Sequence, residues 1–189
     1  MSETAIRRRF PLDTFRTRRT DAVTIEPLGP ASRLSLRCRD EAAIARVGEA
    51  FGTSLPREAC RFTENGTRRA LWLGPDEWTL VAPGEEAGAL GESLADSLHG
   101  TPHSLVDVSE RSVSLAVSGP QAETLLAAGC PLDLSPAATP VGFVSRTVFA
   151  KSEIVLSRTE AVRFELDVWC SFAPYVSSYL AEAARELSA

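Results

Sequence analysis

The residues best suited to chemistry in this sequence form a short polar cluster of Ser109, Glu110 and Arg111. An arginine presents a two-pronged donor that matches a carboxylate, so Arg111 has the chemistry to hold a carboxylate ligand. The competing interpretation is an ion pair in a loop between two consecutive strands. We favour the loop ion pair.

A nucleophile or a metal site has little support. A serine or cysteine nucleophile needs a base within hydrogen-bond reach, and the only histidines, His99 and His103, flank a Gly-Thr-Pro turn without a cysteine or carboxylate at ligand spacing. The cysteines contain no CxxC pair, and we expect them to be reduced, small buried hydrophobic residues. They are Cys38, Cys60, Cys130 and Cys170. We therefore expect no catalytic residue and no metal site.

A nucleotide cofactor also lacks a binding motif. Phosphates need consecutive backbone N–H groups at a helix start, and both GxGxxG and GxxxxGK[ST] are absent from the sequence. The segment Ser118-Gly119-Pro120 lies between a predicted strand and a predicted helix, but its proline has no N–H donor. We interpret it as a strand-to-helix turn, and we expect this chain to bind no flavin or NAD by itself.

Charge is divided unevenly along the chain. Residues 1–39 hold nine arginines and four acidic residues, although the whole chain has a net charge of −5. Clustered arginines can bind phosphates, but the remaining acidic body would repel them. We therefore expect no nucleic-acid partner and interpret residues 1–30 as a basic arm that is solvated or binds a partner. Its candidate interface residues are Arg7, Arg8, Arg9 and Phe10.

Membrane and export signals are missing from the pattern. No window approaches 18 uninterrupted apolar residues, and no apolar stretch follows the charged first ten residues. We expect a cytoplasmic protein without a membrane partner.

Local patterns predict an α+β fold. Residues 32–38 alternate between apolar and polar side chains, which is typical of a half-buried strand, and Asp40 and Gly52 are suitable ends for the helix that follows. The turn Gly74-Pro75-Asp76-Glu77 joins two predicted strands into a hairpin, and a second helix is predicted over 85–98.

The order strand, helix, strand, strand, helix then recurs. The second set comprises strands at 105–108, 113–117, 145–149, 154–156 and 162–168 and helices at 121–128 and 172–187. With 189 residues and 44% apolar content the chain can bury a full core. We predict two similar α+β halves, 31–100 and 101–189, with mainly antiparallel strands and one shared core.

The tryptophans lie at strand ends or strand faces. We expect Trp72 and Trp78 to be core residues. For Trp169 a core position and an exposed interface anchor are equally suitable interpretations. We therefore keep Trp169 and Arg111 as candidate interface residues.

Five segments carry a family resemblance. They read LWLGPDEW at 71–78, VDVSER at 106–111, VSGPQA at 117–122, GCPLDL at 129–134 and RTVFAKSEIVL at 146–156. Together, over roughly residues 70 to 185, they resemble the gamma subunit of heterotetrameric sarcosine oxidase.

The resemblance implies a non-catalytic accessory role. Such a complex oxidises sarcosine to glycine with formation of hydrogen peroxide, and it passes the one-carbon unit to tetrahydrofolate or releases formaldehyde. Other subunits would hold FAD, FMN and NAD, and the expected partners are the alpha, beta and delta subunits.

The same segments are similar to the first domain of the aminomethyltransferase (glycine-cleavage T-protein) family, which binds tetrahydrofolate. That family uses an aspartate in the helix after the last strand of this domain, whereas no Asp or Glu occurs here between Asp167 and Glu182. A partner for a cationic folate adduct is therefore missing. The alternative function is an autonomous tetrahydrofolate-binding or one-carbon-transfer protein. An iron-sulfur maintenance scaffold of the same superfamily is a weaker third, because its lysine-glycine-cysteine motif is absent.

Overall fold

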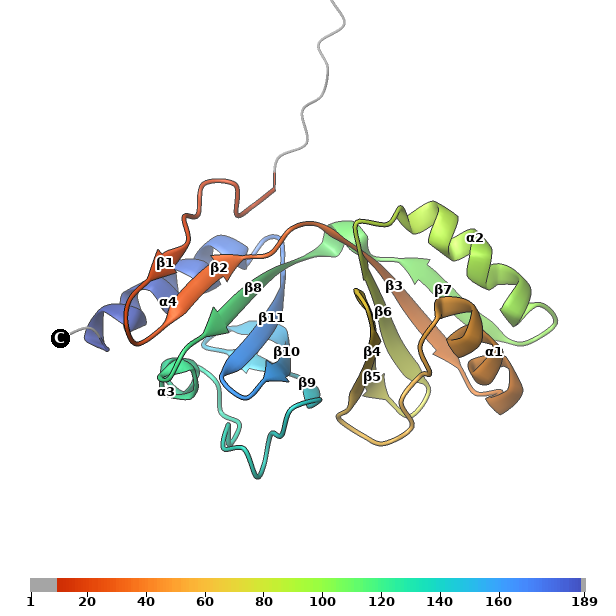
Figure 1. The fold of residues 1–189 in the computed structure, drawn as a ribbon. Helices are drawn as coiled ribbons and strands as arrows, with labels where there is room; N and C mark the ends of the chain where they lie inside the picture. Colours follow the sequence, from red (N-terminus) through yellow and green to blue (C-terminus); the bar gives the residue numbers. More distant parts are fainter. Residues whose placement is uncertain (1–9, 188–189) are drawn as a thin grey trace, which may run out of the picture.

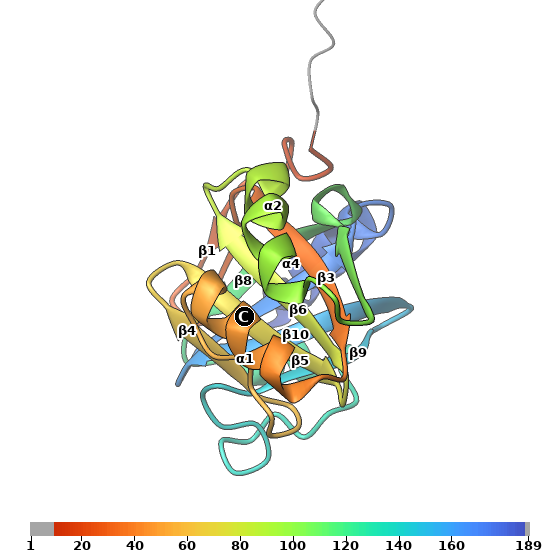
Figure 2. The same ribbon diagram turned by 90° about the vertical axis from the view of Figure 1, so that its right-hand side faces the viewer.

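Two antiparallel β-sheets face each other, and helices cover their outer faces (Figure 1). The computed structural model describes residues 10–187. The end-on view shows α1 and α2 lying across the outer side of one sheet (Figure 2). The layers therefore follow the order helix, sheet, sheet, helix, and the predicted α+β class with mainly antiparallel strands is confirmed.

The first sheet has five strands in the order β4-β5-β6-β3-β7. Its strands are β3 (Ala31–Cys38), β4 (Phe62–Asn65), β5 (Arg68–Gly74), β6 (Glu77–Pro83) and β7 (His103–Asp107). Its helices are α1 (Glu41–Phe51) and α2 (Ala87–Leu98). As predicted, the Asp40 carboxylate accepts a hydrogen bond from the Ala43 N–H at the start of α1, and Gly52 ends the helix in the left-handed conformation.

The second sheet has six strands in the order β1-β2-β8-β11-β10-β9. Its strands are β1 (Arg18–Arg19), β2 (Thr24–Pro27), β8 (Ser112–Ser118), β9 (Val144–Phe149), β10 (Ser152–Glu160) and β11 (Arg163–Trp169). Its helices are α3 (Ala122–Ala127) and α4 (Ala173–Glu186), and a short 3₁₀ helix, η1 (Ser109–Arg111), precedes β8. The ion pair between Arg163 and Glu26 (3.0 Å) joins β11 to β2 across β8.

The two sheets share a strand order and exchange one strand each. Strands β4, β5, β6, β3 and β7 correspond in order to β9, β10, β11, β8 and β2. In the chain β2 precedes β3, yet it pairs with β8; β7 precedes β8, yet it pairs with β3. Each repeat therefore contributes its leading strand to the sheet of the other repeat.

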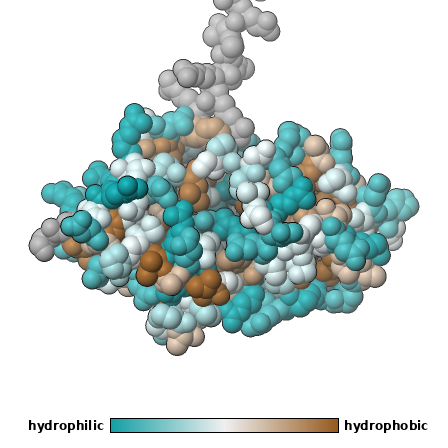
Figure 3. Space-filling model, viewed as in Figure 1, coloured by the Kyte–Doolittle hydropathy of each residue, from teal (hydrophilic) through white to brown (hydrophobic). Residues whose placement is uncertain are grey.

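The hydrophobic core differs from the single shared core that we expected. One buried cluster lies between the five-stranded sheet and α1 and α2, and another lies between the six-stranded sheet and α3 and α4. A third, small cluster of Phe62, Leu71, Val81 and Val144 joins the sheets. The helices bury one face of each sheet, and the other faces meet in the middle. Hydrophilic residues dominate the surface shown in Figure 3.

The boundary expected at residue 30 also differs from the structure. We interpreted residues 1–30 as an arm, but β2 is part of the six-stranded sheet and Ile25 is fully buried in its core. The pattern did not reveal this strand because it is short and ends in Pro27. Residues 1–9 lie outside the described part, and with them Arg7, Arg8 and Arg9.

We predict that Gly119→Ala destabilises the fold. Gly119 has a φ of +120°, and a Cβ atom there would lie 2.6 Å from the Ala22 carbonyl oxygen beside β2. Strain and overlap together should lower the free energy of unfolding by about 2 kcal/mol or more in chemical denaturation.

The matched control is Gly91→Ala in α2, where nothing lies within 4 Å of an added Cβ. Because alanine favours a helix over glycine, this variant should gain about 0.5 to 1 kcal/mol. Equal stability of the two variants would contradict the close approach of β2 to Gly119.

Candidate functional site

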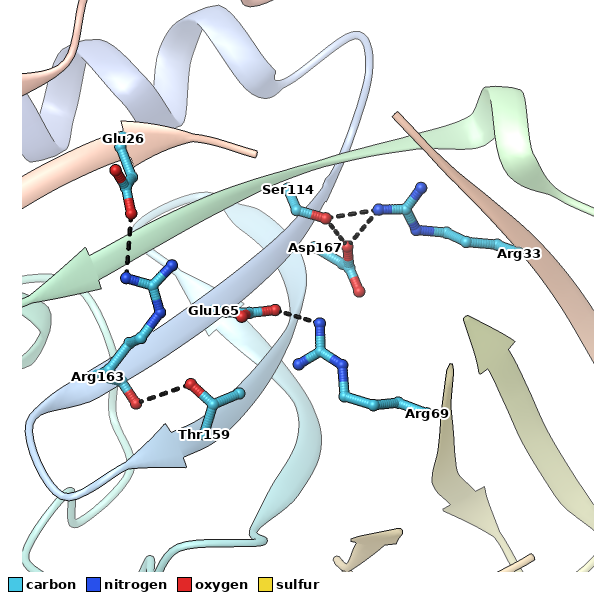
Figure 4. Close-up of polar contacts among 8 residues, drawn as sticks. All are labelled: Glu26, Arg33, Arg69, Ser114, Thr159, Arg163, Glu165 and Asp167. Carbon is cyan, nitrogen blue, oxygen red and sulfur yellow. Dashed lines mark hydrogen bonds and ion pairs between the residues drawn. The ribbon is translucent and has the colours of Figure 1, made fainter. Parts of the chain in front are cut away.

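A polar layer lies where the two sheets face each other. Side chains alternate along a strand, so Leu166 and Val168 of β11 pack under the helices. Glu165 and Asp167 of the same strand therefore point toward the five-stranded sheet. In that sheet Arg33 of β3 and Arg69 of β5 point back, and the four side chains meet (Figure 4).

Arg33 is the centre of this layer. It is only 4% exposed, and its Nη2 donates to Asp167 Oδ1 at 2.9 Å and to the Ser114 hydroxyl. Ser114 in turn donates to the same Asp167 oxygen, and Nη1 of Arg33 donates to the Ala31 carbonyl at 3.0 Å. The buried guanidinium of Arg33 and the carboxylate of Asp167, which is 20% exposed, thus neutralise each other.

Two further ion pairs support the contact between the sheets. Arg69 pairs with Glu165, and both side chains are less than one-fifth exposed. Nearer the surface, Arg146 of β9 pairs with Glu77 of β6 at 2.7 Å. Because Asp167 and Glu165 each hold an arginine, neither carboxylate is a free general base.

A second buried arginine, which the sequence pattern did not reveal, holds the loop before β9. Arg158 is 2% exposed and donates to the carbonyl groups of Leu134 (3.0 Å) and Thr139 (3.1 Å). It also pairs with Glu123 of α3 at 2.6 Å. Its role is structural, since each of these partners belongs to the chain itself.

The polar cluster at residues 109–111 forms the turn between β7 and β8. The Ser109 hydroxyl and N–H both donate to Asp107, and these bonds lower the pKa of Asp107 below its ordinary value. Ser109 Oγ accepts from the Arg33 N–H at 2.9 Å, so the turn is attached to β3. The loop position is as predicted, and within residues 10–187 no carboxylate lies within ion-pair distance of Arg111.

The structure brings Arg111 and Trp169 together. Ser112 and Trp169 are register partners at the ends of β8 and β11, and the Cys170 N–H donates to the Arg111 carbonyl at 2.9 Å. Both side chains are exposed and line a cavity of about 170 Å³ that reaches Arg33 and Asp167. Trp169 is 43% exposed, because its position in β11 places it on the inner face beyond Asp167.

The other residues singled out from the sequence lie elsewhere. Phe10 lines a different cavity of about 350 Å³, whose walls come from residues within 10–16, 27–33 and 109–114. Trp78 is fully buried as predicted and donates to the Pro56 carbonyl at 2.9 Å, and Trp72 is partly buried against the same core. All four cysteines are free; Cys38 and Cys130 are buried as predicted, whereas Cys60 and Cys170 are half-buried.

Residues 10–187 contain neither a metal-binding cluster nor a membrane-spanning helix. No group of three or more His, Cys, Asp or Glu residues there is placed to hold a metal ion. No helix among those residues is both long enough and apolar enough to span a membrane.

The fold defines the class of protein first. The chain superimposes on glycine cleavage system aminomethyltransferase T from Bartonella henselae with a TM-score of 0.62 and 16% identity, over 85% of this chain and 46% of that chain. At this identity the likeness shows the fold alone. The two facing sheets are therefore those of the aminomethyltransferase-like fold.

Closer relatives define the family. A chain of heterotetrameric sarcosine oxidase from Corynebacterium sp. U-96, solved with pyrrole 2-carboxylate, matches with a TM-score of 0.87 and 29% identity over 96% of this chain and 97% of that chain. The sarcosine oxidase subunit gamma of Arthrobacter sp is 31% identical over 88% of this chain and 82% of its own length. Residues 37–186 match the family described as sarcosine oxidase, gamma subunit. The chain belongs to the sarcosine oxidase gamma subunit family.

We predict that Arg33→Ala strongly destabilises the protein. Removing the guanidinium leaves the Asp167 carboxylate, which is 20% exposed, without its cation, and breaking a pair with a buried partner costs about 3 kcal/mol. Chemical denaturation measures this loss.

Arg37→Ala on the same strand is the control. Arg37 is 59% exposed and pairs with Asp76 at 3.3 Å, so its removal should cost less than about 1 kcal/mol. If the two variants lost similar amounts of unfolding free energy, the ion pair between Arg33 and Asp167 would not be a specific support of the fold.

We predict that Ser109→Ala raises the pKa of Asp107 toward its ordinary value of 3.8, because the variant loses the larger of the two hydrogen bonds that lower it. A depressed carboxyl pKa contributes stability above the ordinary value, and this is lost as the pH falls through the folded-state pKa. The variant should therefore lose less stability below pH 3.8 than the parent. Carbon-detected NMR titration measures the pKa, and Ser104→Ala on β7 should leave it unchanged.

Proposed function

We propose that this chain is the non-catalytic accessory subunit of a heterotetrameric sarcosine oxidase. The complex would oxidise sarcosine to glycine and form hydrogen peroxide, with the one-carbon unit passed to tetrahydrofolate or released as formaldehyde. FAD, FMN and NAD would be held by other subunits. The chain would pack against the flavin-bearing subunit and the subunit with the folate domain, among the alpha, beta and delta partners.

The observation that carries this proposal is the neutralised layer between the sheets. The carboxylates that face the middle of the fold, Asp167 and Glu165, are both bound by arginines. The cavity beside Asp167 holds about 170 Å³, less than the roughly 300 to 1,000 Å³ of typical small-molecule sites. A domain built in this way uses the carboxylates of its inner face for internal support.

Exposed apolar side chains support an interface role. Trp169, Phe172 and Tyr175 are each about two-fifths exposed at the junction of β11 and α4. Aromatic residues are enriched where protein interfaces are buried. We place Trp169 and Arg111 in the proposed interface, together with Phe10 and the preceding residues Arg7, Arg8 and Arg9.

The test is purification of the tagged chain from its native host. We expect larger partner chains, a yellow eluate with flavin absorption, and peroxide formation that depends on sarcosine. The same chain expressed alone should be colourless and inactive.

Tetrahydrofolate titration of the isolated chain in a calorimeter tests the alternative, an autonomous folate-binding protein. Heat of binding, together with a colourless eluate that contains no partner, would replace the accessory-subunit proposal by this alternative.

A further inference from the structure

The inner face of the six-stranded sheet extends beyond the sheet that covers it. Val155 pairs with both Asp167 and Arg146 and shares their face. Glu153, Trp169 and Val148 each lie two positions further along the same three strands and therefore on the same face. All three are exposed. They form a row across β10, β11 and β9, which we call the open row.

The cavity behind the open row is rich in guanidinium groups. Arg33, Arg111 and Arg146 line it, against the carboxylates of Asp167 and Glu153. Arg33 is bound to Asp167, and Arg146 is bound to Glu77. The guanidinium of Arg111 has no carboxylate of residues 10–187 within ion-pair distance. With those pairs formed, Arg111 and Glu153 carry the remaining charges of the lining, and Arg111 is the group able to bind an anionic side chain.

A second observation also indicates a missing acceptor. Arg33 is 4% exposed, and its buried Nε has no hydrogen-bond partner among the described residues. A buried N–H without an acceptor is unfavourable. Arg33 thus has an unsatisfied donor beside a cavity that its side chain lines.

We propose that the cavity mouth takes an acidic side chain of a partner subunit, with its carboxylate on Arg111 and its apolar neighbours on Trp169 and Val148. The inference rests on the proposed function and specifies the chemistry of its interface. A cavity of about 170 Å³ has room for several waters of roughly 30 Å³ each, and hence for a carboxylate group. The exposed aromatic residues beside it suit a polypeptide better than a small free anion, since Trp169 and Phe172 add apolar contact area.

The test measures binding of the full chain to the co-expressed remaining subunits. Arg111→Ala should weaken the affinity by about tenfold or more and reduce its dependence on salt. Arg111→Lys keeps the positive charge but loses the planar guanidinium, so its affinity should lie between those of the parent and Arg111→Ala. The control is Arg185→Ala on α4, because the Arg185 side chain is 72% exposed. This variant should bind the remaining subunits with the affinity of the parent chain.

Thermal unfolding of each variant shows whether it folds. Binding of the parent chain with no loss in Arg111→Ala overturns the inference while the accessory role stands. Failure of the parent chain to bind the remaining subunits overturns the accessory role itself.

A photo-crosslinking residue in place of Trp169, in the assembled complex, identifies the partner segment. We expect a crosslinked peptide with an Asp or Glu near the attachment point. A peptide without an acidic residue, or no crosslink to a partner, contradicts the inference.

Discussion

The contact of Arg33 with Asp167 and Ser114 is the interaction on which the arrangement of the two sheets depends. Each sheet has its own apolar core under its own helices, and the apolar cluster that joins the inner faces is small. A displaced guanidinium would leave both its own charge and that of Asp167 unpaired. The Arg33 contact therefore fixes the register of one sheet over the other, with Arg69 and Glu165 as a second point of attachment.

Strand exchange also holds the two sheets in this relative position. Strand β2 leads the first repeat but pairs with β8, and β7 leads the second repeat but pairs with β3. Separating the repeats would break both ladders as well as the central ion pairs. The turn of Asp107 and Ser109 lies at one of these crossovers and bonds to the backbone of Arg33. One of the five segments that carry the family resemblance, residues 106–111, thus joins the exchanged strand β7 to the central arginine.

Local elements could be predicted from the sequence, because each depends on residues that are close in the chain. The Asp40 cap, Gly52 and the turn at 74–77 determine helix and hairpin ends without reference to the remaining structure. The pairing of Arg33 with Asp167 joins residues 134 positions apart. Alternation showed that the strands have a polar face but gave no indication that a second sheet covers it. For the same reason Trp169 was equally suitable as core and as interface; only the extent of that cover decides its exposure.

The same arrangement separates support from recognition in this fold. Ion pairs occupy the middle of the inner faces, where both members belong to the chain and are shielded from solvent. Toward the end of β11 the five-stranded sheet no longer covers the inner face, and the residues of that face are exposed. Alternation places Trp169 on the same face as Asp167, two residues further along. A single strand therefore carries both the carboxylate that holds the sheets together and an exposed aromatic side chain, so that a rigid interior positions the side chain that we propose for the interface.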